Sequence, residues 1–219
     1  MQPFPGNSDG HGNVVFNFQG NPVGDLPAFA HGYHRAGKAL AATLDAAPGY
    51  ADYEGYPIFF VYRHALELYL KAVVYRGAML LHLISECDLD TSRLFTSHRL
   101  APLLPHVRAI WASQHWSFEG TRFGSFEHFE SIIRWLDQVD PQSYSFRYPM
   151  SRTGEAQLPH HFVINVVSFS GTMDALLDLL AGAVTGLTEE FQLAAEARYE
   201  LSQYFERQAN TEEQNEGLR

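Results

Sequence analysis

The chain has 219 residues, of which 46% are apolar and 18% are charged, a composition typical of a globular protein rather than a disordered one. Its 15 basic and 25 acidic residues give a formal charge of −10, which argues against a general nucleic-acid binder, because phosphate affinity needs clustered Lys and Arg. A single cysteine excludes an internal disulfide, and we find neither a signal-peptide pattern nor an uninterrupted apolar run of about 18 residues. We therefore expect a cytoplasmic protein that does not insert into a membrane.

The N-terminal stretch, residues 1–26, is rich in Gly, Asn and Pro and predicts an arm rather than a helix. Inside it, residues 14–18 read Val-Val-Phe-Asn-Phe, which is typical of a short extended segment. A first helix is predicted from about Pro27 to Ala46, because a Pro-Gly pair follows closely. We expect the arm to pack on this subunit or on a partner.

A second helix is predicted from Pro57 to about Leu83, with the proline in the first turn, where a missing N–H has no helical partner to lose. Nearly every position up to Val74 is apolar or aromatic. This pattern predicts a helix that is buried on most sides.

Four polar residues, Arg63, His64, Glu67 and Lys71, interrupt this apolar helix. Arg63, Glu67 and Lys71 are spaced i, i+4, i+8 and so share one face, where Glu67 and Lys71 are expected to form an ion pair. The stripe has two interpretations. It is either a structural salt-bridge ladder or the wall of a groove between two subunits, where Arg and His meet a phosphate.

Two further helices are predicted after a loop. Ser97 is the expected N-cap of a third helix that ends near Trp116 and becomes regular near Pro105. A fourth helix is predicted from about Ser125 to Val139, where an Asp-Pro pair stops it.

The last helix is predicted to start near Val163, after a hairpin or ordered loop over residues 144–159. Its apolar residues alternate in steps of four and three, as in a coiled-coil seam, and we expect two glycines on it, Gly182 and Gly186, to mark close packing. The seam consists of Met173, Leu177, Leu180, Val184, Leu187 and Phe191, and it resumes at Leu201 and Phe205.

These elements predict an all-α fold, an antiparallel helical bundle over residues 27–208 with a short extended N-terminal arm and a long C-terminal helix. Residues 190–219 hold seven acidic and three basic residues, and the polar tail from residue 209 is predicted to be disordered. The length of the apolar seam predicts a homodimer to which the last helix contributes contact area.

Three motifs resemble landmarks of the HEPN superfamily. Residues 67–72 read Glu-Leu-Tyr-Leu-Lys-Ala, like the E-x-x-L-K-A signature of a central HEPN helix. Residues 98–104 read like the H-x-L-x-x-L start of the next helix, and residues 147–149 match the R-Y-P that often precedes the last helix. The three occur in the family's order, and the resemblance covers residues 27–190.

The resemblance implies a helical bundle that cleaves RNA as a homodimer without a metal or another cofactor, in a prokaryotic toxin–antitoxin or phage-defence system. It also implies a possible protein partner, either an antitoxin or a larger defence effector. The family's site is an R-x4–6-H motif, in which His shuttles a proton and Arg stabilises negative charge on the phosphate. The sequence contains no motif for a metal or a nucleotide phosphate.

Arg122 and His128 have this spacing and lie where the motif is expected, although Phe123 follows the arginine where a polar residue is usual. The same spacing occurs at Arg76–His82, Arg93–His98 and Arg99–His106. An alternative, composite site draws on several elements and consists of Arg63, His64, His98 and Arg147, with Glu67, Lys71 and Tyr148 as further binding residues.

Two other functions fit the same sequence. A non-catalytic HEPN-like bundle could serve as a dimerisation or partner-binding module, since aromatic-rich helices and a long seam suit an interface. A nucleotide or small-ligand pocket could form around Arg63, His64 and Arg147.

Overall fold

The computed structural model describes residues 10, 12, 14, 23–46, 52–85, 89–151, 153–159 and 162–216; for residue 45 and residues 209–216 it describes the backbone alone. Most of the predicted arm lies outside the described residues, including residues 15–18 of its extended segment. The single cysteine, Cys87, also lies outside them.

Within the described residues the fold is all-α, as predicted. The five α-helices are α1 Leu26–Ala46, α2 Asp52–Ser85, α3 Leu104–Ser113, α4 Phe126–Val139 and α5 Val166–Glu216. A short 3-10 turn, η1 (Ala101–Leu103), precedes α3. The part of the chain that the structure describes contains no β-strand, only one isolated bridge between Met150 and Ala156.

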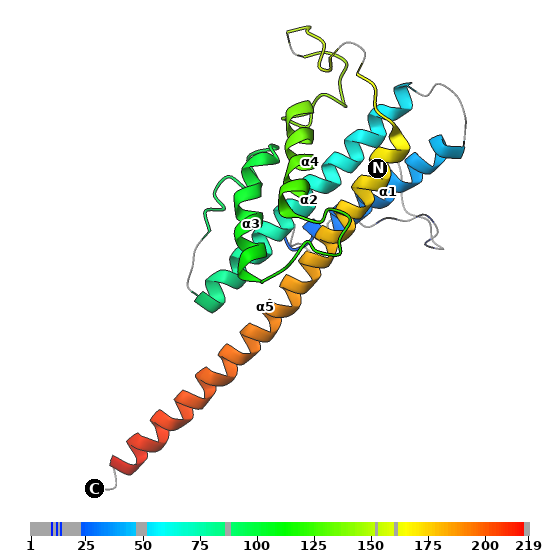
Figure 1. The fold of residues 1–219 in the computed structure, drawn as a ribbon. Coiled ribbons are helices and arrows are strands. Elements are labelled where there is room, and N and C mark those ends of the chain that lie inside the picture. Colours follow the sequence, from blue (N-terminus) through cyan, green and yellow to red (C-terminus); the bar gives the residue numbers. More distant parts are fainter. Residues whose placement is uncertain are drawn as a thin grey trace.

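Helix α2 is the centre of the bundle. α1, α3 and α5 all pack against it, α1 runs antiparallel to it, and α4 contacts η1 (Figure 1). Tyr62, Leu66 and Leu70 on α2 are fully buried, as the nearly uniform apolar sequence of this helix predicts.

Helix α2 begins at Asp52, five residues before the predicted start at Pro57. Inside a helix, Pro57 has no N–H to donate to the carbonyl of Tyr53. Tyr53 is 86% exposed, so water can reach this end of the helix and replace the missing bond.

The predicted regular start of the third helix near Pro105 is confirmed, but its predicted N-cap is wrong and it ends three residues before Trp116. Ser97 does not cap it; its Oγ accepts a hydrogen bond from the Arg99 amide (3.1 Å), and α3 runs only from Leu104 to Ser113. The start of α4 is confirmed, because Ser125 caps this helix by accepting a hydrogen bond from the His128 amide at 3.2 Å.

The described residues between α4 and α5 form a loop at one end of the bundle (Figure 1). At its tip the Ser151 amide donates to the Glu155 carbonyl (2.8 Å), and Gly154 adopts the left-handed region with φ of 83°. This hairpin-like turn agrees with the expectation for residues 144–159.

Helix α5 begins at Val166, where Asn165 caps it by accepting from the Ser168 amide at 2.8 Å. Its first half is buried in the bundle, and its second half extends away from it (Figure 1). The helix continues to Glu216, past residue 209, where the sequence predicted a disordered tail. Residues 209–216 contain neither Gly nor Pro, so nothing in this stretch terminates the helix.

Two described helices, α2 and α5, are long and apolar enough to cross a membrane by length and composition. In α2, 44% of the apolar window is buried inside the fold, and in α5, 33%. The cytoplasmic location therefore stays a prediction.

Of Gly182 and Gly186, the two α5 glycines predicted to mark close packing, only Gly186 has a neighbour in contact range. A Cβ added at Gly186 would lie 3.4 Å from Cζ2 of Trp116, whereas a Cβ at Gly182 would meet no atom within 4 Å. The tightest glycine is instead Gly77 on α2, where an added Cβ would lie 2.6 Å from Cγ1 of Ile110 on α3.

These glycines give a matched pair of variants. Gly182→Ala should raise the free energy of unfolding by about 0.5–1 kcal/mol, because alanine favours the helix and nothing obstructs it. Gly77→Ala should lower it by about 1–2 kcal/mol, because the clash with Ile110 outweighs the same gain. Urea unfolding measures both, and equal stability of the two variants would contradict the α2–α3 packing.

Candidate functional site

Arg63 on α2 is completely buried and holds three parts of the chain together. Its Nη1 donates to Oε2 of Glu67 (3.1 Å), its Nη2 to the His98 carbonyl (2.7 Å) and its Nε to the Asp140 carbonyl (2.9 Å). A buried charge is tolerated only where such partners surround it. Arg63 therefore ties α2 to the segment before η1 and to the end of α4.

Glu67 is the buried carboxylate at the centre of this network. Its Oε1 accepts from Nζ of Lys71 (2.7 Å) and lies 2.9 Å from Nδ1 of His98, so the predicted pair of Glu67 and Lys71 is confirmed. Burial alone would raise the pKa of Glu67, but the hydrogen bonds and charges of Lys71, His98 and Arg63 outweigh it and hold the pKa below its usual value.

This contact fixes the tautomer of His98. Because Glu67 is ionised and can only accept, Nδ1 of His98 carries the proton in the hydrogen bond. The neutral ring then has its lone pair on Nε2, and 58% of the side chain is exposed. A buried carboxylate thus orients a solvent-facing imidazole, an arrangement that general-base catalysis uses.

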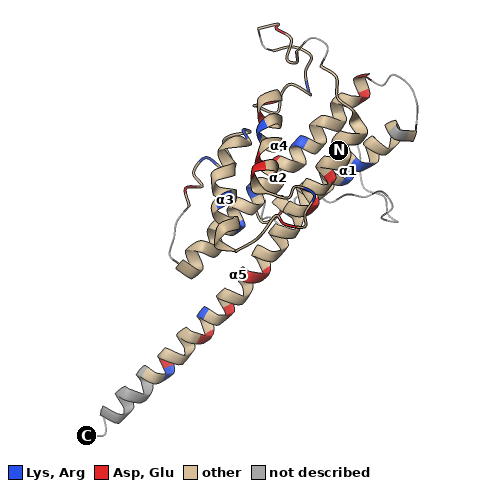
Figure 2. Ribbon diagram, in the orientation of Figure 1, with Lys and Arg blue, Asp and Glu red and all other residues tan. Residues whose placement is uncertain are grey.

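Two aspartates at the end of α4 extend this network, Asp137 to the segment after His98 and Asp140 to Arg63. Oδ1 of Asp137 accepts from the Leu100 amide (2.6 Å), and its Oδ2 accepts from Nη2 of Arg99 (2.8 Å). Oδ1 of Asp140 accepts from the backbone amides of residues 144 and 145. Its other oxygen, Oδ2, lies 3.3 Å from Nε of Arg63. Acidic and basic residues accordingly meet where α2 passes α4 (Figure 2).

The sequence analysis missed both aspartates, although a signal for Asp137 exists. Asp137 is four residues after Ile133, which is buried. Helical spacing therefore places the Asp137 carboxylate on the buried side of α4, whereas Asp140 follows Val139, the last residue of the helix. An acidic residue in the apolar register of a helix indicates a polar partner, here the Leu100 amide and the Arg99 guanidinium.

His64 lies on the same side of α2, one turn before Glu67. Its ring meets Tyr33 edge-on (4.4 Å between centroids) and stacks on Phe60 (5.8 Å). Burial lowers the pKa of His64 below 6.5, and the nearby Glu67 carboxylate only partly opposes this effect. His64 is therefore neutral at pH 7.

Arg147 brings an exposed cation to this side of α2. Its guanidinium carbon lies 5.4 Å from the Phe60 ring centre and 5.9 Å from that of Tyr148, and its Nε donates to the Ser143 carbonyl. We call the set of Phe60, His64, Glu67, Lys71, His98, Arg147 and Tyr148 the α2 face. It contains two imidazoles, an exposed guanidinium and exposed ring surface. Contacts join its members in two groups: Phe60 meets His64 and Arg147, with Tyr148 beside the guanidinium, and Glu67 binds Lys71 and His98.

Arg122 and His128 have separate contacts. Nη1 of Arg122 donates to the Gly171 carbonyl on α5 (2.8 Å), and Nδ1 of His128 lies 3.0 Å from the Phe123 carbonyl. In the part of the chain that the structure describes, neither side chain contacts the other. Phe123 is buried, which explains why an apolar residue follows Arg122: it belongs to the core.

The structure thus brings His98 to Arg63 and Glu67, and Arg147 to Phe60 beside His64, whereas Arg122 and His128 bond to separate backbone carbonyls. Arg63 differs from the prediction in one respect: its guanidinium is fully buried, so it supports the site and does not touch a ligand at the surface. In the part of the chain that the structure describes, no group of three or more His, Cys, Asp or Glu side chains is placed to hold a metal ion.

Comparison of the chain with protein-family models, with curated proteins and with solved structures gives no match in any of the three. The likeness to HEPN proteins therefore stays a prediction that depends on the three sequence motifs.

Proposed function

We propose that this protein is a HEPN-like, RNA-directed protein that cleaves RNA on the α2 face without a metal. The observation that carries the proposal is the pairing of the buried Glu67 carboxylate with the exposed His98 ring, which leaves Nε2 of His98 free to take a proton. In this role His98 replaces His128 as the candidate base.

The chemistry follows from the groups on this face. Nε2 of His98 removes the proton from a ribose 2′-hydroxyl, and the 2′-oxygen attacks the adjacent phosphorus. The bond from phosphorus to the 5′-oxygen breaks, and that oxygen takes a proton from water. The products are a 2′,3′-cyclic phosphate and a 5′-hydroxyl. The guanidinium of Arg147 stabilises the charge on the phosphate oxygens during the attack.

Binding on this face relies on rings and a few cations. Phe60 and Tyr148 flank Arg147, and stacking on aromatic side chains holds unpaired bases without sequence preference. Single-stranded or loop RNA is therefore the proposed substrate. The setting in a toxin–antitoxin or phage-defence system, with an antitoxin or a larger effector as partner, is proposed from the motif resemblance alone.

The purified protein should cleave single-stranded RNA in EDTA and leave DNA of the same sequence intact, because DNA lacks the attacking 2′-hydroxyl. Increasing salt should slow the reaction, since an acidic protein holds RNA through few cations. His98→Ala should reduce the rate by about 10²–10⁴-fold, the usual contribution of a general base. Gel electrophoresis measures the rate, and mass spectrometry detects the cyclic phosphate.

His115→Asn is the matched control. His115 is an exposed histidine after α3 with φ of 54°, a backbone conformation that asparagine tolerates well, so full activity is expected. Full activity of His98→Ala would refute the proposed base. No cleavage of any RNA by clean wild-type protein would refute the enzyme.

A second candidate function, a dimerisation module, is favoured by the part of α5 that leaves the bundle. Arg198 bonds to the Leu83 carbonyl near the end of α2 (3.3 Å), which marks where the bundle ends. Beyond it, Leu201 and Phe205 continue the buried seam but are 57% and 65% exposed. A free helix of this length is marginal in water, so we propose that a second copy covers the seam.

Light scattering at micromolar concentration should show a dimer, a species with twice the 24.7 kDa mass of the chain. The double variant Leu201→Glu with Phe205→Glu should be a monomer, because charges on the seam oppose its burial. Gln192→Glu with Gln203→Glu adds the same charge on the opposite side of the helix and should remain a dimer. A wild-type protein of 24.7 kDa would contradict the dimer.

A further inference from the structure

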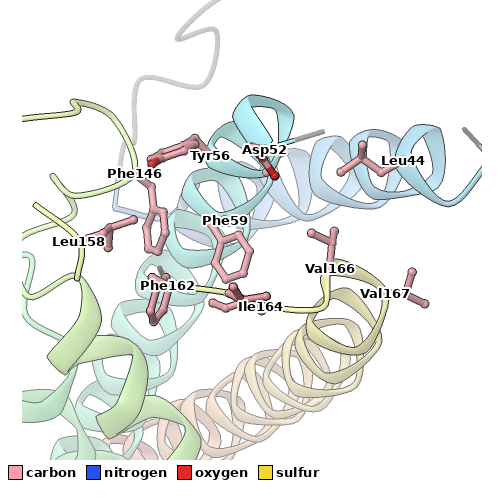
Figure 3. Close-up of a pocket in the computed structure, with 12 residues that line it drawn as sticks. Leu44, Asp52, Tyr56, Phe59, Phe146, Leu158, Phe162, Ile164, Val166 and Val167 are labelled. Atoms are coloured by element: carbon pink, nitrogen blue, oxygen red, sulfur yellow. The ribbon is translucent and has the colours of Figure 1, made fainter. Parts of the chain in front are cut away.

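A second concave site lies where the end of α1, the start of α2 and the segment before α5 meet (Figure 3). It is a pocket of about 420 Å³, within the roughly 300–1,000 Å³ range of small-molecule sites. Leu44 of α1, Phe59 of α2 and Val166 of α5 line it, together with Phe162 from the segment before α5. None of these residues belongs to the α2 face.

Aromatic rings form most of one side of the pocket. Phe59 stacks on Phe146 at 5.0 Å between centroids, and Tyr56 meets Phe146 edge-on at 6.4 Å. Figure 3 shows these rings, with Phe162 beneath them, around the same space. Ring faces attract cations as well as apolar groups, so the lining suits a flat organic body that carries a positive charge.

Asp52 is the only charged residue among the described residues that line the pocket. It is exposed, stands in the first turn of α2, and extends on the side that faces Phe59 and Val166 (Figure 3). A carboxylate beside aromatic rings at the mouth of an apolar pocket is complementary to an ammonium or guanidinium group.

Two helix N-termini at this end of the bundle oppose that preference. The first turns of α2 and α5 each contribute about half a positive charge. One amide of the α5 turn is already bound by Asn165, and the first turn of α2 carries two full negative charges, Asp52 and Glu54. The balance is therefore negative and favours a cation.

We propose that this pocket binds a small organic cation with an aromatic body, its charged group beside Asp52 and its body among Tyr56, Phe59, Phe146 and Phe162. The proposal does not depend on RNA cleavage. Arg147 follows Phe146 directly in the chain but contacts Phe60 on the α2 face, so the pocket and the α2 face are separate sites on either side of this turn.

The test is a titration of the full chain with tryptamine, followed by ¹H–¹⁵N NMR. A ligand of this size in a partly open pocket should bind with a dissociation constant on the order of 1 mM or tighter. Saturable shifts are expected at the amides of Phe59, Phe146 and Val166. Indole-3-propionate, a matched anion with the same ring, should bind at least fivefold more weakly.

Three variants locate the binding site. Gly55 lines the pocket and has open space around an added Cβ, so Gly55→Leu should fill the pocket without unfolding the chain and should abolish tryptamine binding. Asp52→Asn should weaken tryptamine binding by about fivefold, as loss of a partly exposed ion pair does. Glu54→Gln removes a charge from the same turn outside the pocket and should have a smaller effect.

Three results would overturn the proposal. The first is the absence of saturable shifts at the pocket amides with millimolar tryptamine. The second is unchanged tryptamine binding by Gly55→Leu. The third is binding of indole-3-propionate as tightly as tryptamine, which would show that the helix N-termini outweigh Asp52.

Discussion

The fold is organised around the need to neutralise one buried guanidinium. Arg63 has no exposed surface, so every hydrogen bond that it loses to water on folding must be replaced by the protein. Glu67, the His98 carbonyl and the Asp140 carbonyl provide the replacements, and each comes from a different part of the chain. The arrangement of α2, the η1 segment and the end of α4 follows from that requirement.

The buried charges also determine what the surface can do. Glu67 is held ionised by Arg63 and Lys71, and its remaining hydrogen-bonding capacity fixes the ring of His98. The exposed Nε2 of His98, the base in the proposed reaction, is thus positioned by the buried Glu67 carboxylate. Arg122 illustrates the opposite case: it is an exposed cation, but its hydrogen bonds go to the backbone of α5.

Much of the fold could be predicted from local sequence. The Pro-Gly and Asp-Pro pairs indicate where α1 and α4 end, the nearly uniform apolar sequence of α2 indicates its burial, and the spacing of apolar residues indicates the seam of α5. The site could be predicted only in part: the spacing of Glu67 and Lys71 predicts their pair, whereas His98 reaches Glu67 from 31 residues away. Local spacing carries no information on such contacts. Asp137 and Asp140 were missed because their partners come from other elements, and the R-x4–6-H spacing selected Arg122 and His128 by sequence distance alone.

The most direct test of the buried network is the free energy of unfolding of Glu67→Ala at pH 7, measured by urea denaturation. The variant leaves the charges of Arg63 and Lys71 buried without their carboxylate, so a loss of about 3–5 kcal/mol is expected. Glu127→Ala, which removes an exposed partner of Arg108, should remain close to wild type. If Glu67→Ala proves as stable as Glu127→Ala, the network does not hold these elements together.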